Sequence, residues 1–462
     1  MRNNSRRWRS AILLITLSEC AVGQGQPARS VATRYTDAAK PPFHDALNVL
    51  DFGAFNDYRS HLLSSMFPSM AAAQVVYPEA TSLSEEANVA AIQRALNSTD
   101  QIWGGSVYLP SGGYVVNSSI WLRHPHVHVY GGGQTETQLI TNSTDFNVIE
   151  LQESYLQLDD FWINQYGVAS DKKYWAIHDA TSGGAYDLDI SRVEIAGGHS
   201  GIYSTGGRTI FFRCKITGIA PRNGVGMMFD GNSEVHDIIS PYMENAAAKN
   251  ANAGIYIAKG ADYSLIDAQL QKMGTPLMVR PGPGDVVASV KASGSYFDSS
   301  SASGILLDGS ASHASIVNVT LDSPWISSDR IGLEMRGAVT GLTVSNIEAL
   351  GNSGAGVDAS EATFITGLTI TGGKISGNGG SGILVGSGLS RFTISGVTVG
   401  PSGQFGSNKV GISIASGNGD YFSIVGNNLA GNVDGGLVNA SSGTHVNIAA
   451  NLDDGKTGVV VH

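Results

Sequence analysis

A pattern of short apolar runs interrupted by glycine recurs along most of the chain. From about residue 200, each unit has a glycine, two or three apolar or β-prone residues, a turn and a second short apolar run. The runs are rich in Val and Ile and show no helical period, which is typical of β-strands. Successive units begin 22 to 29 residues apart, at Gly201, Gly226, Gly254, Pro276, Gly304, Gly332, Gly356, Gly382, Gly411, Gly436 and Gly458.

A period of about 25 residues is typical of leucine-rich repeats and of parallel β-helices. Leucine-rich repeats need regularly placed leucines and an asparagine ladder, and we find neither in these units. One unit cannot bury its own apolar face, so the units must stack and share a continuous core. We therefore predict an all-β fold, a right-handed, single-stranded parallel β-helix with coils of about 25 residues.

One amphipathic helix is predicted ahead of the repeats. Residues 84–97 carry apolar side chains at helical spacing, and Ser82 and Glu85 have the spacing of a capping box. We expect this helix to cap the first coil, which would otherwise expose a sheet edge. No such helix follows the last repeat, so that end would be covered in a homo-oligomer or left as a frayed coil.

The first residues have the pattern of a targeting signal. Four arginines precede the apolar run at 11–17, and Ala21 and Gly23 suit a signal-peptidase site. We predict a signal peptide at 1–23, a linker at 24–45, an N-terminal cap at 46–116 with an insert at 56–83, and the parallel β-helix at 117–462. The mature protein would then be secreted, into the periplasm or the medium.

Composition and charge limit the partners. The net charge is −11, and no basic patch follows the first ten residues, which argues against nucleic acid. No run beyond the signal is long enough to span a bilayer, so we expect no membrane partner for the mature form. Signal cleavage would remove Cys20 and leave Cys214, in a strand-like run, without a disulfide partner. We expect Cys214 to be buried and inert.

Three segments occur in the order known from one superfamily. They are Asn-Val-Leu-Asp-Phe-Gly-Ala at 48–54, Ala-Ile-Gln-Arg-Ala-Leu at 91–96 and Gly-Gly-Ser-Val-Tyr-Leu-Pro-Ser-Gly-Gly-Tyr at 104–114. With the coil repeat, they resemble the pectate-lyase-like superfamily, which includes tailspike depolymerases, rhamnogalacturonases and C5-epimerases. The resemblance covers about 48–462. It implies a β-helix that binds carbohydrate, most often to cleave an acidic or complex polysaccharide.

The resemblance does not assign the reaction. The catalytic motifs of polygalacturonases, alginate epimerases and pectate lyases are absent. Site residues must therefore come from the registry of the coils, which predicts two columns of charged side chains. Four positions past the coil starts lie Asp230, Arg280, Asp308 and Arg336, with Lys259 beside them. Eighteen positions past the starts lie Glu244, Lys272 and Asp322, followed further on by Lys374, and Asp298 lies late in its own coil.

Paired carboxyls on such a column suit glycoside hydrolysis. Retaining enzymes hold them about 5–5.5 Å apart and inverting enzymes about 6.5–9.5 Å apart, which one or two coils can provide. We choose Glu244 as the catalytic acid, because Tyr242 lies beside it, followed by Asp298, Asp230 and Asp308. This chemistry needs no cofactor. The same aspartates would also be explained as turn caps or as a surface ladder of ion pairs.

A lyase would instead neutralise a uronate with cations or Ca²⁺ and remove a proton. Tryptophan and tyrosine side chains, on which sugar rings stack, concentrate before residue 326, and of these two residue types only Tyr421 follows. We therefore expect the binding surface over coils 120–330, although a bulkier core there would also account for the aromatics. We predict no metal centre. The expected substrate-binding residues are Arg280, Lys272, His236, Tyr242, Tyr263, Tyr296 and Arg336.

These observations predict a secreted polysaccharide-degrading enzyme, with hydrolysis favoured over β-elimination. The alternative is a non-catalytic carbohydrate-binding or adhesion solenoid. A phage tailspike is the least favoured reading, because of the predicted signal peptide.

Overall fold

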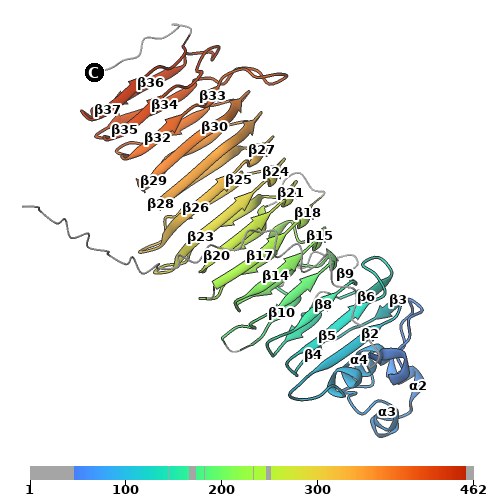
Figure 1. Ribbon diagram of the computed structural model, residues 1–462. Coiled ribbons are helices and arrows are strands. Elements are labelled where there is room, and N and C mark those ends of the chain that lie inside the picture. Colours follow the sequence, from blue (N-terminus) through green and yellow to red (C-terminus); the bar gives the residue numbers. More distant parts are fainter. Residues whose placement is uncertain are drawn as a thin grey trace, which may run out of the picture. The chain divides into compact units, whose positions relative to one another are not determined.

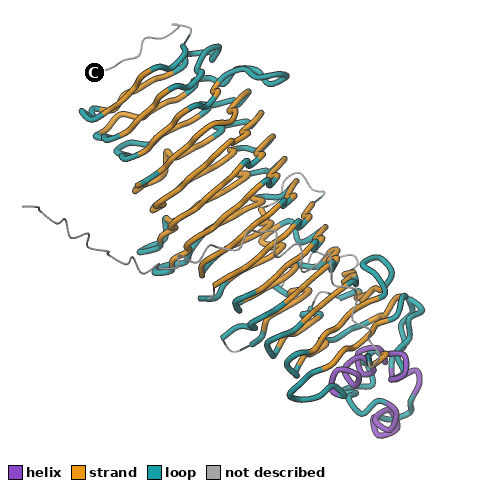
Figure 2. The backbone as a smooth tube through the Cα atoms, in the orientation of Figure 1, coloured by secondary structure: helices purple, strands orange, loops and turns teal. Residues whose placement is uncertain are grey.

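The computed structural model describes residues 46–143, 145–165, 173–181, 183–232, 234–245 and 251–453. The predicted signal peptide and linker lie outside the described residues. The unit that begins at Ala46 is a stack of coils in which all pairings between named strands are parallel (Figures 1 and 2). This is the predicted right-handed parallel β-helix. Each full coil contributes one strand to each of three ladders, which we number in the order in which a coil visits them.

Ladder 1 carries the start of each repeat. Its strands are β4 (Ile120–Leu122), β7 (Ile149–Leu151), β10 (Trp175–Asp179), β13 (Ser200–Ser204), β16 (Arg222–Phe229), β19 (Ala251–Ile257), β22 (Thr275–Val279), β25 (Ser303–Gly309), the first part of β28 (Ile331–Leu350), the first part of β29 (Val357–Thr366), β31 (Ile383–Val385), β34 (Ile412–Gly417) and β36 (Leu437–Ser441).

Ladder 2 follows the next turn of each coil. Its strands are β1 (Leu47–Asn48), β2 (Gly105–Leu109), β5 (Val127–Gly131), β8 (Gln157–Asp159), β11 (Asp189–Ser191), β14 (Thr209–Phe212), β17 (Glu234–Ile239), β20 (Gly260–Ile266), β23 (Val286–Ser293), β26 (Ser315–Asp322), the middle of β28, the first part of β30 (Leu368–Ser376), β32 (Phe392–Ser395), β35 (Phe422–Val425) and β37 (Val446–Ala449).

Ladder 3 has the shortest strands and closes each coil. Its strands are β3 (Gly112–Val115), β6 (Thr137–Thr141), β9 (Trp162–Gln165), β12 (Glu194–Gly197), β15 (Lys215–Thr217), β18 (Tyr242–Glu244), β21 (Gln269–Gln271), β24 (Tyr296–Asp298), β27 (Trp325–Ser327), the last parts of β28 and β30, and β33 (Thr398–Val399).

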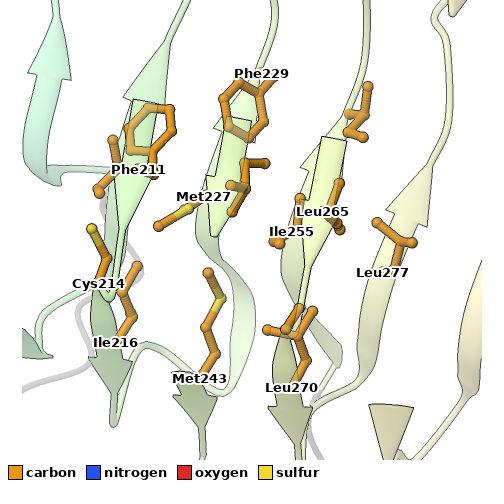
Figure 3. Close-up of a cluster of buried hydrophobic side chains, with 14 of the residues drawn as sticks. Phe211, Cys214, Ile216, Met227, Phe229, Met243, Ile255, Leu265, Leu270 and Leu277 are labelled. Carbon is orange, nitrogen blue, oxygen red and sulfur yellow. The ribbon is translucent and has the colours of Figure 1, made fainter. Parts of the chain in front are cut away.

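Apolar side chains at alternate strand positions point inward and stack coil upon coil. In ladder 1, Met227, Ile255 and Leu277 are in register and fully buried (Figure 3). Burying one such side chain stabilises the fold by roughly 1.5–3 kcal/mol. Cys214 lies in this core, as expected, and burial raises the pKa of its thiol to about 12.

Strand register confirms the predicted coil starts from 201 to 436. The residue after each start pairs with its equivalent on the next coil, as Leu333 does with Val357. Most of these starts are glycine, because neighbouring backbones nearly touch there. A Cβ atom on Gly332 would lie only 2.3 Å from the carbonyl oxygen of Gly356.

The corner between ladders 3 and 1 holds an asparagine ladder, so the expectation that the coils lack one was wrong. Asn352 Nδ2 donates to Asn378 Oδ1 (2.9 Å), Asn378 Nδ2 to Asn408 Oδ1 (2.8 Å), and Asn408 Nδ2 to Asn432 Oδ1 (3.1 Å). These four side chains are buried. The ladder is hard to see in the sequence because its rungs are 24 to 30 residues apart and the coil lengths vary.

The N-terminal cap consists of η1 (Val49–Phe52), α2 (Leu63–Met66), α3 (Met70–Val76) and α4 (Ala87–Asn97). Helix α4 confirms the predicted capping helix, but it begins three residues later than expected. The capping box is wrong, because Glu85 accepts hydrogen bonds from Thr81 and Ser118 and the N-cap residue is Glu86. None of the helices in the described residues is long and apolar enough to cross a membrane.

Candidate functional site

The first predicted column of charges is present along ladder 1. Asp308 lies opposite Arg336 in the strand register, and Arg280 Nε donates to Asp308 Oδ2 from the previous coil (2.9 Å). Arg336 also pairs with Glu334, at 2.5 Å, and with Glu361, at 3.3 Å. Most of this column is therefore a chain of ion pairs, the structural alternative considered above.

Asp308 cannot act as an accessible catalytic carboxyl. Its side chain is buried and accepts hydrogen bonds from both the hydroxyl and the backbone N–H of Ser310. Burial raises the pKa of Asp308, but the hydrogen bonds from Ser310 and the nearby Arg280 outweigh that effect and lower it. The structure contradicts the catalytic prediction for Asp308, because its buried carboxylate is out of reach of a polymeric substrate.

The second predicted column needs correction. Glu244 is in register with Gln271, and Gln271 with Asp298, so these three residues form one outward column of ladder 3. Asp322 belongs to ladder 2, and Lys374 lies opposite Glu348 in a neighbouring column. Turns of different length shift the register, so a fixed count of eighteen residues does not stay on one column.

Glu244 is held as an ionised carboxylate. Lys272 Nζ donates to its Oε1 from the next coil (2.5 Å), and the Tyr242 hydroxyl donates to its Oε2. These two hydrogen bonds lower the pKa of Glu244. Lys272 reaches back because its backbone has a left-handed φ of 55° directly after β21. A carboxyl with a lowered pKa suits a base better than the acid predicted for Glu244.

Asp298 lies two coils from Glu244, beside an open depression of about 250 Å³. It accepts hydrogen bonds from Ser299 Oγ (3.0 Å) and Ser327 Oγ (2.5 Å). Tyr296 and Trp325 line the depression, with their ring centroids 6.2 Å apart, and Tyr296 is half exposed. We name the outward side of β18, β21, β24 and β27 the acidic face.

Two predicted binding residues lie in the core instead. His236 and Tyr263 are each 1% exposed, stack on one another at 4.5 Å and pack against Phe229. His236 Nδ1 lies 2.7 Å from Thr209 Oγ1, and the Tyr263 hydroxyl donates to the carbonyl of Lys259. The prediction that they bind substrate is wrong, because neither ring reaches the surface.

A larger pocket of about 530 Å³ lies on ladder 1, and the sequence did not single it out. Tyr203, Met228, Tyr256 and Met278 occupy equivalent outward positions of four successive coils along it. Trp175 stands 5.2 Å from Tyr203, ring centroid to ring centroid. We call this the aromatic pocket. Its aromatic residues were visible in the sequence only as part of the excess before residue 326.

Few ionisable side chains line the aromatic pocket. Lys173 and Arg280 line it, together with His199. The Tyr203 hydroxyl donates weakly to Asp230 Oδ2 (3.4 Å), and burial, aided by the charge of Asp230, raises the pKa of Tyr203 to about 12. Asp230 directly follows β16 of ladder 1, whereas Glu244 and Asp298 lie on ladder 3. The four predicted carboxyls therefore do not form one site.

Metal binding finds no support in the described part of the chain. Among the described residues, no group of three or more His, Cys, Asp or Glu side chains lies close enough together to hold a metal ion. Ca²⁺ therefore stays an expectation tied to the lyase alternative.

Comparison with known proteins supports the fold. No family model and no curated protein matches the sequence. The tailspike protein gp49 of Pseudomonas phage LKA1 matches 87% of this chain over 83% of its own length, with 14% identity and a TM-score of 0.50. Tailspike protein 3 of bacteriophage CBA120 matches 87% of this chain over 59% of its own, with 14% identity and a TM-score of 0.50.

A third similar structure is the A-module of the mannuronan C-5 epimerase AlgE6 from Azotobacter vinelandii. It matches 88% of this chain over 98% of its own, with 16% identity and a TM-score of 0.49. The two tailspike proteins are parallel β-helix proteins, and the likeness to them confirms the parallel β-helix fold predicted from the sequence. At such identities the likeness concerns the fold alone.

Proposed function

We propose that this pectate-lyase-like β-helix is a secreted polysaccharide-degrading enzyme, and that it hydrolyses a glycosidic bond on the acidic face. The observation that carries the proposal is the pair Glu244 and Asp298. Both are partly exposed, both lie on one outward column, and aromatic rings flank them. The coil registry of the sequence also predicts both residues in the late part of their coils.

The spacing of the pair is closer to that of inverting than of retaining enzymes. Two strand spacings of about 4.8 Å place the two Cα atoms roughly 9.6 Å apart. Inverting hydrolases hold their carboxyl groups about 6.5–9.5 Å apart, which leaves room for a water molecule. Glu244, ionised by its contacts with Lys272 and Tyr242, would activate that water as the base. Asp298 would protonate the leaving oxygen, and Tyr296 with Trp325 would hold the sugar ring.

The reaction is tested by incubating the mature protein with neutral and acidic polysaccharides. Reducing ends and the ultraviolet absorbance of unsaturated uronates are followed together. We expect reducing ends to rise without absorbance on at least one polymer. A parallel rise of both signals would identify β-elimination and contradict the hydrolytic proposal.

The aromatic pocket favours a second candidate function, non-catalytic binding of a saccharide. Its lining of Tyr203, Met228, Tyr256 and Met278 offers two tyrosine rings and two thioether side chains over about three strand spacings. The nearby Asp230 accepts a hydrogen bond from Tyr203. The Tyr203→Ala/Tyr256→Ala variant should lose glycan affinity without losing turnover of short oligosaccharides. Loss of both would instead place the reaction in this pocket.

A further inference from the structure

The asparagine ladder begins with an aspartate. The backbone N–H of Asp329 donates to Asn352 Oδ1 at 3.0 Å, just as the N–H of Asn352 donates to Asn378 Oδ1 at 3.0 Å. Side-chain positions agree as well. A Cβ atom on Gly356 would meet Asn378 Nδ2 at 2.9 Å, and one on Gly304 would meet Asp329 Oδ2 at 2.4 Å. Oδ2 of Asp329 therefore occupies the place of the amide nitrogen in the rungs that follow.

This replacement removes a donor from the ladder. Asn352, Asn378 and Asn408 each use Nδ2 to donate to Oδ1 of the next rung. An ionised carboxylate has no hydrogen to give, so two acceptors would face each other. Oδ2 of Asp329 is buried and has no hydrogen-bond partner among the described residues. Its Oδ1 is satisfied, because the backbone N–H of Ser300 (2.7 Å) and the Ser300 hydroxyl both donate to it.

We propose that Asp329 is a protonated carboxylic acid whose Oδ2–H donates to Asn352 Oδ1, and that it positions the turn after Asp298 through Ser300. The proton completes the first rung of the ladder. Loss of the proton would leave a buried charge facing an acceptor and loosen the corner. The effect on Asp298 rests on the proposed function, whereas the protonation of Asp329 does not.

The surroundings of Asp329 agree with a neutral acid. Burial raises its pKa to about 8, against the lowering effect of the Ser300 hydrogen bonds, and Asp298 in β24 adds to the rise when it is ionised. The other charged groups nearby in the chain are Arg330 and Glu334 of the β28 region, which pair with each other at 3.6 Å. No cation is therefore placed to compensate an ionised Asp329 among the described ion pairs.

The link to the acidic face is short. Ser300 follows Asp298 by two residues, and the intervening Ser299 donates its hydroxyl to Asp298 Oδ2. The turn 298–300 is thus fixed at one end by Ser327, which donates to Asp298, and at the other by Asp329. Asp329 is a positioning residue, since it acts on the acidic face through this turn and does not line it.

The Asp329→Asn variant tests the protonation through thermal unfolding at a series of pH values. A buried acid with a raised pKa takes up a proton on folding, so wild-type stability should fall as pH rises from about 4 to about 8 and then level off. Asn carries the donor permanently, so the melting temperature of the variant relative to the wild type should climb over that window by several degrees. A difference that stays constant with pH would overturn the proposal. Asp322→Asn, at a partly exposed aspartate, is the control and should show no such climb.

Infrared spectroscopy gives a reading that does not depend on the variant's stability. The wild-type protein at pH 7 should show a protonated-carboxyl carbonyl band that disappears above about pH 8, and Asp329→Asn should lack it. Absence of that band from the wild type would refute the proposal even if the variant fails to fold. If a polymer is turned over, its kcat should fall above about pH 8 in the wild type and less in Asp329→Asn. Turnover lacking on every polymer would count against the proposed function and leave the first two tests intact.

Discussion

The β-helix has a first half, up to residue 330, and a second half after it. The two halves share an apolar interior but differ in their outward side chains. Inward positions of ladder 3 are apolar throughout, with Phe297 in the first half and Ile375 in the second. The outward column that holds Tyr242, Gln269, Tyr296 and Trp325 continues after residue 330 as Glu348, Lys374 and Thr398. The fold therefore tolerates either set of outward residues, and the aromatic set has a reason other than packing.

The corners of the coils also differ between the two halves, and here the distinctive residues lie in the second half. From Asn352 to Asn432 the corner before ladder 1 is a continuous run of buried amide rungs. Before residue 300 the same corner carries Asn245 and Asn252, whose amide groups donate to the backbone carbonyls of Ile219 and Ala220 and form no such run. Regular corners give a stiff and uniform stack, whereas irregular corners leave room for a site.

The largest expected effect is a loss of kcat on substitution in the first half, with no loss on substitution in the second half. Glu244→Gln and Asp298→Asn should each lower kcat about 10²- to 10⁴-fold, because each removes a general acid or base. Glu348→Gln, on the same ladder in the second half, is the matched control and should keep kcat. Initial rates of reducing-end release measure this. Equal rates for Glu244→Gln and the wild type would remove Glu244 from the reaction.

The next effect is on stability and belongs to the second half. Asn378→Ala would leave the N–H and Nδ2 of Asn352 without their acceptor and would remove two donor bonds of Asn378 itself. We expect the free energy of unfolding to fall by about 3 kcal/mol, since each unsatisfied buried group costs about 1–3 kcal/mol. Denaturant titration followed by circular dichroism measures it. Asn447→Ala, at an exposed position, should change it by less than about 0.5 kcal/mol. A similar loss in both variants would show that the ladder is not special.

A smaller effect concerns affinity on the acidic face. Trp325→Ala should weaken glycan binding about 5- to 10-fold, equivalent to about 1–1.4 kcal/mol, because it removes one stacking surface. Trp103→Ala changes an exposed tryptophan of the cap and should leave affinity unchanged. Isothermal calorimetry with the inactive Asp298→Asn background measures both. Unchanged affinity in Trp325→Ala would separate the depression from substrate binding.

The smallest effect is a pH dependence near the last coils. The hydrogen bond from His445 lowers the pKa of Asp420 to about 2, with His445 in turn stacked on Tyr421. A lowered carboxyl pKa stabilises the folded state above the unfolded pKa near 4, and that stability is lost as pH falls toward 2. His445→Ala should therefore lose slightly less stability than the wild type between pH 4 and pH 2, measured by thermal unfolding. A parallel loss in both proteins would exclude the pair as a contributor.

The fold could be read from the sequence because its signal is repeated many times. Coil starts and the column close to them, such as Arg280 with Asp308, were placed correctly because few residues separate them from the start. The column that holds Glu244 was not, since its members lie 17 to 23 residues past their starts and the intervening turns vary. Positional error grows with the number of irregular turns between a residue and its reference.

The second limit on prediction from the sequence was whether a strand residue points inward or outward. His236 and Tyr263 point inward because the residues before them, Val235 and Asp262, have left-handed φ angles of 67° and 57°, which interrupt the alternation of faces. Nothing in the residue types at these positions requires that conformation. The aromatic pocket was missed for a related reason: it forms from four coils whose relevant residues are spaced 22 to 28 apart in the sequence.

The stacking of the coils gives the second half a length that depends on the number of its coils. Each coil advances the stack by about 4.8 Å whatever its residue count, because strand pairing alone sets the step. Deleting residues 383–411 would join Gly382 to Ile412 and offer Val357 an equivalent neighbour, since Ile383 and Ile412 occupy the same position. The reach of the chain beyond the acidic face can thus be lengthened or shortened by whole steps, without altering the coils that carry the chemistry.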